Sequence, residues 1–287
     1  MTKCFFVTDL HGHIDRYEKL AAEIRSAPPA AVFLGGDLLP HVSGALAATG
    51  RYVEDFAHDY LIFLFAGLKK QLGKQYPRVF VILGNDDARI EEDAFIEAAD
   101  DGLWDYVHRG HAKLGDYDIY GYACVPPTPF QLKDWERFDV SRHIDPGCVS
   151  PEEGVRSVAV PERDAKYRTI AEDLEALAGE NELSRAVILF HTPPYKTKLD
   201  RAALDGQMID YVPLDVHVGS IAVLRFIENR QPLLTLHGHV HESARLTGAW
   251  QERIGDTLCL SAAHDGPELA LVTFELDNLT NIERRLL

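Results

Sequence analysis

Five short apolar runs recur along the chain, and each is followed by a polar residue that carries a lone pair. The runs and the residues that follow them are Cys4 to Val7 with Asp9, Ala31 to Leu34 with Asp37, Val79 to Leu83 with Asn85, Ala186 to Phe190 with His191, and Leu233 to Leu236 with His237 to His241. Continuous apolar runs of this length are typical of strands that are covered on both faces. We therefore expect five buried strands with polar side chains at their carboxyl ends.

Segments with helical spacing lie between these runs. The apolar positions of two such segments are Ile14, Tyr17, Leu20, Ala21 and Ile24 in the first, and Val53, Phe56, Tyr60, Phe63 and Leu64 in the second. A third helix is expected after Ser220, a favourable N-cap, and Pro232 ends it before the next strand. Strands that alternate with helices predict an α/β protein with a parallel-type sheet, which binds ligands at the carboxyl ends of its strands.

Two stretches interrupt this alternation. Residues 122–165 contain six prolines among large aromatic residues, which predicts an ordered irregular insertion that flanks the site. The second stretch, residues 192–219, carries three basic side chains that either bind substrate phosphate or lie in a solvated loop, namely Lys196, Lys198 and Arg201. Near the end of the chain, residues 257–262 and 269–276 are expected to be two strands joined by a turn.

Composition limits the class of protein. The chain has 287 residues, 46% of them hydrophobic, a length that allows two domains or one large α/β unit. Its 45 acidic and 29 basic residues give a net charge of −16, which disfavours nucleic acid and favours a small solute as partner. No apolar run approaches the ~20 residues of a membrane span, and no signal-peptide pattern or close cysteine pair is present. We expect a cytoplasmic protein without a membrane partner.

The polar residues at the five strand ends form one set of hard metal donors without a thiolate. They are Asp9, His11, Asp37, Asn85, His191, His239 and His241. Such oxygen and imidazole donors suit divalent first-row metals and do not distinguish manganese, iron, zinc and nickel. Seven protein ligands are too many for one open catalytic ion but fit two ions that share a carboxylate. We therefore expect two divalent ions, and of the four metals we favour manganese.

These donors fall into ordered blocks along the chain. The blocks are Asp9-Leu10-His11, Gly36-Asp37, Gly84-Asn85, His191 and Gly238-His239-Val240-His241. In this order they resemble the D-x-H, G-D, G-N, H and G-H-x-H pattern of the calcineurin-like metallophosphoesterases. The resemblance implies a single domain over residues 1–287, folded as a four-layer α-β-β-α sandwich with two mixed sheets. It also implies that one ion is held by Asp9, His11 and His241, the other by Asn85, His191 and His239, and that both share Asp37.

The resemblance further implies a metal-dependent phosphoric ester hydrolase that acts on a small phosphorylated molecule, as a phosphodiesterase or a phosphatase. The two ions would lower the pKa of a bridging water, so that hydroxide attacks phosphorus in line without a covalent phosphoenzyme. A metal-binding scaffold protein of the same fold is the main alternative. A nuclease is disfavoured by the acidic charge and the lack of a basic stripe. The sequence indicates neither the physiological substrate nor the oligomeric state.

The block Gly84-Asn85-Asp86 departs from the family pattern, in which a histidine that assists the leaving group often follows the asparagine. An aspartate titrates at about 3.9, and nearby cations lower its pKa further, so we expect Asp86 to be ionised at neutral pH. Asp86 could then face a cationic part of the substrate. His13 is the second candidate catalytic residue, because it lies on the same loop as His11 and could protonate the leaving group.

Other histidines lack the support of an ordered motif. We assign His41, His58, His108, His143 and His217 to solvent or structural roles, and His237 and His264 to packing near strand ends or turns. Asp87 is expected to hold a metal ligand or a neighbouring loop in place.

Overall fold

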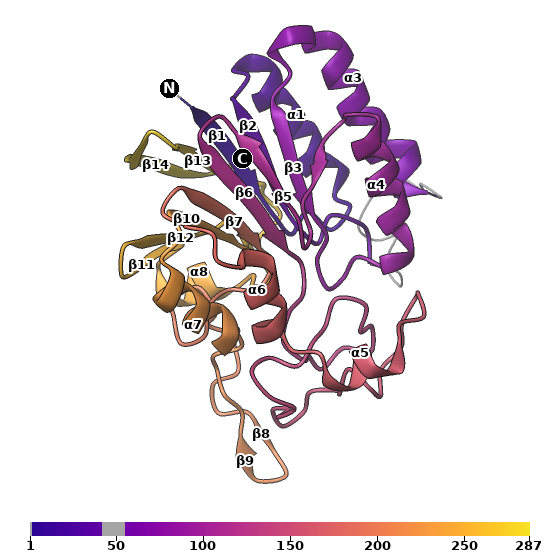
Figure 1. Cartoon of the computed structure of the whole chain (residues 1–287), viewed down its shortest axis with the longest axis vertical. Helices are drawn as coiled ribbons and strands as arrows, with labels where there is room; N and C mark the ends of the chain where they lie inside the picture. The colour runs from indigo at the N-terminus through magenta and orange to yellow at the C-terminus, as the bar shows by residue number, and fades with distance from the viewer. Residues whose placement is uncertain (1, 42–54) are drawn as a thin grey trace.

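The computed structural model describes residues 2–41 and 55–287. Its frame is a pair of six-stranded mixed sheets packed face to face, with helices on the outer sides (Figure 1). The chain thus has the four-layer α-β-β-α architecture that the sequence resemblance implies. Val53, the first apolar position of the second expected helix, lies outside the described residues.

The first sheet combines the N-terminal strands with a C-terminal hairpin. Its order is β14 (Asn278–Leu286), β13 (Ala270–Glu275), β1 (Lys3–Val7), β2 (Ala31–Gly35), β3 (Arg78–Ile82) and β4 (Asp105–Tyr106). Strands β1 to β4 are parallel, and β13 runs antiparallel to both β1 and β14. All five residues of β2 are buried, which is the burial expected of a continuous apolar strand between two layers.

The second sheet is also mixed, with a parallel centre and an antiparallel strand at each edge. Its order is β11 (Gln251–Ile254), β12 (Thr257–Ser261), β10 (Leu234–His237), β7 (Ala186–Phe190), β6 (Tyr117–Tyr122) and β5 (His111–Leu114). The last two expected strands correspond to β12 and β13. They form no hairpin, because β12 pairs with β10 and β13 pairs with β1, so the turn between them crosses from one sheet to the other.

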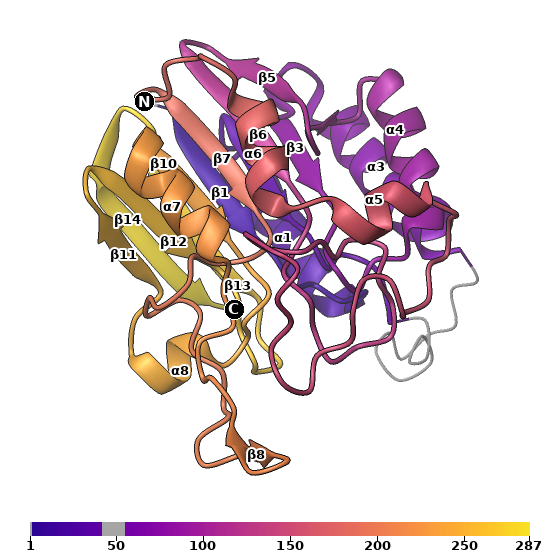
Figure 2. The same cartoon turned by 60° about the horizontal axis from the view of Figure 1, so that its bottom comes forward.

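Helices cover the outer faces of both sheets (Figure 2). The first sheet carries α1 (Ile14–Ser26), α3 (Phe63–Leu72) and α4 (Glu92–Asp100), and the second carries α6 (Ile170–Ala178) and α7 (Ile221–Arg230). The remaining elements are α5 (Glu162–Tyr167), α8 (Ser243–Thr247), a β8 (Met208–Ile209) to β9 (Val212–Pro213) hairpin, and helical turns at Ala57–Ile62, Gly73–Gln75 and Arg89–Glu91. As expected, α7 begins after Ser220, whose hydroxyl accepts the Val223 N–H at 3.0 Å. Within the described ranges, no helix is long and apolar enough to cross a membrane.

The chain between β6 and α5 is irregular but firmly anchored. Residues 123–161 contain isolated bridges and no helix or strand. Lys133 and Glu136 are fully buried here, with Lys133 Nζ 2.5 Å from Glu136 Oε2. The indole of Trp135 is also buried and donates to the Asp87 carbonyl at 2.8 Å. These contacts tie the segment to the loop that follows β3. That it is an insertion stays a prediction.

Candidate metal centre and substrate cavity

The seven predicted metal ligands meet at one end of the two sheets, although His11 and His241 lie 230 residues apart in the sequence. All seven stand in loops at the carboxyl ends of β1, β2, β3, β7 and β10. Four of them, Asp9, His11, Asp37 and His239, have φ between 47° and 70°. Side chains disfavour this left-handed backbone region, and residues held in it cluster at functional sites.

One group of donors contains Asp9, His11, Asp37 and His241, each with an atom within 4.8 Å of the others. His241 Nε2 lies 3.1 Å from His11 Nε2 and 3.4 Å from Asp9 Oδ1. Asp37 Oδ2 lies 3.9 Å from His11 Nε2. Two ligands bound to one ion at about 2.1 Å are themselves about 3 to 3.5 Å apart, so this spacing fits a shared cation.

A second group of donors contains Asp37, His191 and His239. His191 Nε2 lies 3.1 Å from Asp37 Oδ2 and 3.1 Å from Asn85 Oδ1. On its other side, His191 Nδ1 lies 2.9 Å from the Gly35 carbonyl, and this hydrogen bond directs Nε2 toward the donors. Asp37 therefore belongs to both groups, which is the arrangement expected of a carboxylate between two ions.

Two imidazoles of the site are paired with carboxylates. Burial lowers the pKa of His191, but the Asp37 and Asp9 carboxylates and the Gly35 carbonyl together outweigh burial and raise it to about 10. For Asp37, burial raises the pKa, but His191, His11 and the Asp86 N–H together outweigh burial and lower it. His241 and Asp9 behave in the same way, and the pKa of His241 is raised to about 9. Cations in the site would take over the role of these imidazolium charges.

The remaining features of the cluster also fit a metal centre. Burial lowers the pKa of His11 to about 4 and that of His239 to about 3, so both are neutral imidazoles with a lone pair to offer. Asp9 Oδ2 is buried without a hydrogen-bond partner, although a buried carboxylate oxygen normally has one. A Cβ at Gly238 would lie 2.8 Å from this oxygen, so glycine keeps the space beside it open.

Asp86 lies beside the first donor group, with two imidazoles next to its carboxylate. Its Oδ2 lies 3.7 Å from His11 Nδ1 and 3.3 Å from His41 Nδ1, and the His41 ring stacks on the His11 ring with centroids 4.8 Å apart. Burial, followed by repulsion from Asp37 and Asp87, raises the pKa of Asp86 to about 8. The sequence analysis expects the opposite, a lowered pKa and an ionised Asp86, because it assumes cations beside this carboxylate.

Three histidines without a sequence motif lie at the site: His41, and His143 and His217, which line the cavity. The sequence pattern favours solvent or a structural role for His41, yet this residue lies next to both Asp86 and His11. The available signal was its position four residues after Asp37, on the same strand-end loop. His13, by contrast, is the N-cap residue of α1 and is not among the described residues that line the cavity. Its catalytic role stays a prediction.

Asp87 joins two of the loops that carry predicted ligands. Its fully buried carboxylate accepts the N–H groups of Leu38 at 2.9 Å, Leu39 at 2.7 Å and Gly84 at 2.8 Å. These bonds hold the loop after β2 against the loop after β3, as expected for a residue that supports a neighbouring loop. His237 is buried between the Thr192 carbonyl and the Thr235 hydroxyl, which agrees with its expected packing role.

A cavity of about 810 Å³ opens from the candidate metal centre toward solvent. Asp37, Asn85, Asp86, His239 and His241 line its inner end. Its outer walls come from residues 126–148 and from the chain between Tyr195 and Ile221. Residues of the 122–165 stretch, which was expected to flank the site, thus line the same cavity as the donors, and so does the second irregular stretch.

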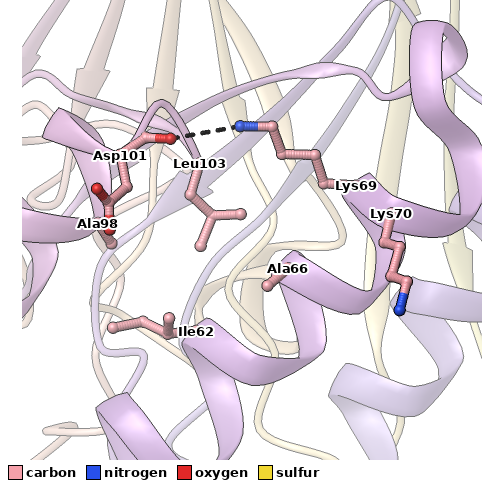
Figure 3. A pocket seen from close by; sticks show the side chains of 7 residues that line it. All are labelled: Ile62, Ala66, Lys69, Lys70, Ala98, Asp101 and Leu103. Atoms are coloured by element: carbon pink, nitrogen blue, oxygen red, sulfur yellow. Dashed lines mark hydrogen bonds between the residues drawn. The ribbon is translucent and has the colours of Figure 1, made fainter.

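A second hollow lies between α3 and α4 (Figure 3). It measures about 350 Å³ and is lined by Ile62, Ala66, Lys69, Lys70, Ala98, Asp101 and Leu103. Lys69 Nζ donates to the backbone carbonyls of Asp101 at 3.4 Å and Gly102 at 2.8 Å. None of the predicted site residues lines this hollow, so it is separate from the metal centre.

The family model of the calcineurin-like phosphoesterases matches residues 2–243, most of the chain and all seven donors. The chain belongs to this family. The match confirms the family resemblance drawn from the sequence blocks, and it places the protein among phosphoesterases, which are hydrolases.

Solved structures agree with this assignment at the level of the fold. The TT1561 protein of Thermus thermophilus aligns with a TM-score of 0.55 and 18% identity, over 99% of this chain and 98% of its own. A dimetal phosphatase from Danio rerio aligns with a TM-score of 0.50 and 13% identity, over 94% of this chain and 91% of its own. One further solved chain reaches a TM-score of 0.61 at 20% identity, over 99% and 98% of the two chains. A search of the curated proteins found no significant match.

Proposed function

We propose that this protein is a dinuclear metal-dependent hydrolase of a small-molecule phosphoester, acting as a phosphodiesterase or a phosphatase. The observation that carries the proposal is the pair of donor groups that share Asp37 at the inner end of a cavity. One ion would be held by Asp9, His11 and His241, and the other by Asn85, His191 and His239. Divalent ions there would lower the pKa of a bound water to near neutrality and offset negative charge on the phosphoryl oxygens.

The protein's own hydrogen bonds support this division of roles. Asp37 Oδ1 accepts the Asp86 N–H at 2.9 Å, which leaves Oδ2 to face both donor groups. Asp9 Oδ1 accepts the His239 N–H at 3.0 Å, and Asp9 Oδ2 has no protein partner. Such outer contacts orient metal ligands before an ion arrives. Asp9 and Asp37 offset only part of the charge of two divalent ions, so the centre attracts a phosphoryl group although the chain is acidic.

A metal-binding scaffold is the second candidate. It is favoured by Asp86, which stands where the family pattern often has a histidine that assists the leaving group. A protein of this kind would bind both ions without cleaving a phosphoester. The cavity of about 810 Å³ that reaches the donors favours the hydrolase, because it gives a small substrate access to them.

Metal analysis of the purified protein, followed by hydrolysis assays with added manganese, tests the proposal. The substrates are p-nitrophenyl phosphate and bis-p-nitrophenyl phosphate, one a monoester and the other a diester. We expect turnover of at least one, lowered about a thousandfold by His191→Ala and by chelation of the metal. The matched control is His58→Ala, because the exposed His58 pairs with Asp55 on the surface and should leave the rate unchanged. Two bound ions without turnover would instead establish the scaffold.

A further inference from the structure

Two segments of the chain contribute apolar side chains to the outer part of the cavity. Phe130 and Val140 line it from the segment between β6 and α5. Ile209 and Leu214 line it from the opposite side, on and beside the β8–β9 hairpin. The two sides approach each other closely, since a Cβ at Gly147 would collide with the Ile209 side chain. The surface that leads away from the candidate metal centre can therefore contact a hydrocarbon chain on more than one side.

Away from the candidate metal ligands, the Asp, Glu, Lys and Arg residues that line this cavity are all acidic. Among its described lining residues, none is Lys or Arg, whereas Asp139, Asp145, Asp215 and Glu242 contribute carboxylates. Three of these accept hydrogen bonds from the protein: Asp139 from the Ile221 N–H, Asp215 from the Tyr195 hydroxyl, and Glu242 from the Ala203 N–H. His143 Nε2 lies 3.6 Å from Asp145 Oδ1. A ligand with a second negative charge would find no fixed cation here and would face repulsion.

The apolar lining continues onto the β8–β9 hairpin, which projects from the body of the molecule in both views (Figures 1 and 2). Besides Ile209, this hairpin carries Met208, 56% exposed, and Tyr211, 95% exposed. Exposed apolar side chains are common singly, but Met208 and Tyr211 lie on the same short hairpin as Ile209, which lines the cavity. The cavity thus has the candidate metal ligands at its inner end, and apolar side chains together with carboxylates in its outer part.

We propose that the substrate is an amphiphilic phosphoester: one phosphate at the metal centre, joined to an apolar chain that carries no further negative charge and lies along the cavity wall. This proposal rests on the proposed function for the position of the phosphate. It excludes nucleoside polyphosphates and other polyanions as good substrates, because their extra charges would lie among carboxylates.

The proposal has two parts, a preference for an apolar tail and the exclusion of a second negative charge. Three phosphonates, which cannot be hydrolysed, test these parts separately. Methylphosphonate, hexylphosphonate and 5-carboxypentylphosphonate share one head group and differ only in the tail. Titration calorimetry on the manganese-loaded protein should give hexylphosphonate an affinity at least about tenfold above methylphosphonate, because its added methylenes are buried. The carboxylate tail should lower the affinity at least about tenfold relative to hexylphosphonate. Equal affinities for the three, binding of the charged tail as tight as that of hexyl, or no binding of any would overturn the proposal.

Substitutions at Ile209 locate the tail. Ile209→Asp should bring the hexyl-to-methyl affinity ratio close to one, and Ile209→Lys should improve binding of the carboxylate tail relative to hexyl at least about threefold. The matched controls are Ile96→Asp and Ile96→Lys, since Ile96 on α4 is 40% exposed against 38% for Ile209 and does not line the cavity. If both Ile209 variants keep the wild-type ratios, the tail does not lie along this wall and the proposal fails.

The binding experiment and the hydrolysis assay can fail independently of each other. A clear preference for hexylphosphonate without turnover of either p-nitrophenyl ester would reject the hydrolase and keep the amphiphile site. Turnover of those esters without any tail preference would keep the hydrolase and reject the amphiphile.

Discussion

At the inner end of the cavity the candidate metal ligands stand at the ends of five sheet strands, whereas the outer walls come from the irregular segments 123–161 and 192–219. The loops that carry these ligands are joined by backbone hydrogen bonds. For example, the Gly238 N–H donates to the His191 carbonyl at 2.9 Å. The outer segments are instead held by buried charged side chains. The comparison indicates that the sheets position the candidate metal ligands, while the irregular segments shape the outer walls of the cavity.

Asp200 illustrates how an outer wall is held without a sheet. Its fully buried carboxylate accepts the N–H groups of Lys196 at 2.9 Å, Thr197 at 3.0 Å and Gly219 at 3.2 Å, and lies 2.8 Å from His217 Nδ1. One side chain thus gathers both ends of the segment that carries the β8–β9 hairpin. None of these Asp200 contacts involves a predicted metal ligand. The conformation of residues 192–219 can therefore change without moving the candidate metal ligands.

The largest expected effect comes from Asp37, the donor that both groups share. Asp37→Asn removes a negative charge between two cations and should lower the rate on bis-p-nitrophenyl phosphate at least about a thousandfold. Metal analysis should find fewer than two ions per chain. As a control, Asp116→Asn changes a carboxylate that is 89% exposed on its side chain and should leave rate and metal content unaltered. An active variant with two bound ions would contradict the assignment of Asp37 as the shared ligand.

The outer wall should respond most strongly at Lys133. Lys133→Met leaves the buried Glu136 carboxylate without its ion-pair partner and should lower the free energy of unfolding by about 3–5 kcal/mol. Urea denaturation measures this change. The matched control is Lys113→Met, because the pair of Lys113 and Asp118 is partly exposed and its loss should cost less than about 1 kcal/mol.

The same variant shows whether the two regions are independent. If the sheets alone position the donors, folded Lys133→Met protein should retain its metal content while it loses the preference for hexylphosphonate. A loss of both ions at a denaturant concentration where the protein is still folded would show that the outer wall supports the metal centre directly.

Asp87 lies at the junction of the two regions, so its removal should have an intermediate effect. Asp87→Asn replaces one acceptor oxygen with an NH₂ group that faces backbone donors, and we expect a loss of about 1–3 kcal/mol in stability. Thermal or urea unfolding measures the loss. The exposed Asp15→Asn, in the first turn of α1, should shift stability by less than about 1 kcal/mol.

The sequence predicted the strands that are apolar throughout and missed those that are not. The five expected runs match β1, β2, β3, β7 and β10 to within a residue or two. Strand β6 is central and buried in its second half, but Asp118 and Gly121 interrupt its pattern. The edge strand β14 is mostly exposed or half-buried, so no apolar run marks it. A continuous apolar run reports burial on both faces, and edge or interrupted strands lack that signal.

The candidate site likewise contains residues that the sequence reveals and residues that it does not. Its donors follow the strands directly and could be named from their blocks in the sequence. His41 has a weaker signal, its position four residues after Asp37, because its contact with His11 joins two different loops. The course of residues 123–161 was hidden, since buried pairs such as Lys133 with Glu136 are recognised only once the chain is folded.

The smallest expected effect concerns Asp86, which lines the cavity beside the candidate metal ligands and lies next to His41. On bis-p-nitrophenyl phosphate, whose leaving group needs little protonation, Asp86→Asn should change the rate less than about threefold. On phenyl phosphate, whose leaving group is poorer, Asp86→His should raise the rate at least about tenfold, because a general acid typically contributes about 10²–10⁴-fold. Steady-state rates on both substrates, with metal content measured in parallel, distinguish proton donation from altered metal binding. If both variants match the wild type on every ester, Asp86 takes no part in leaving-group departure, and the hydrolase depends on an activated leaving group alone.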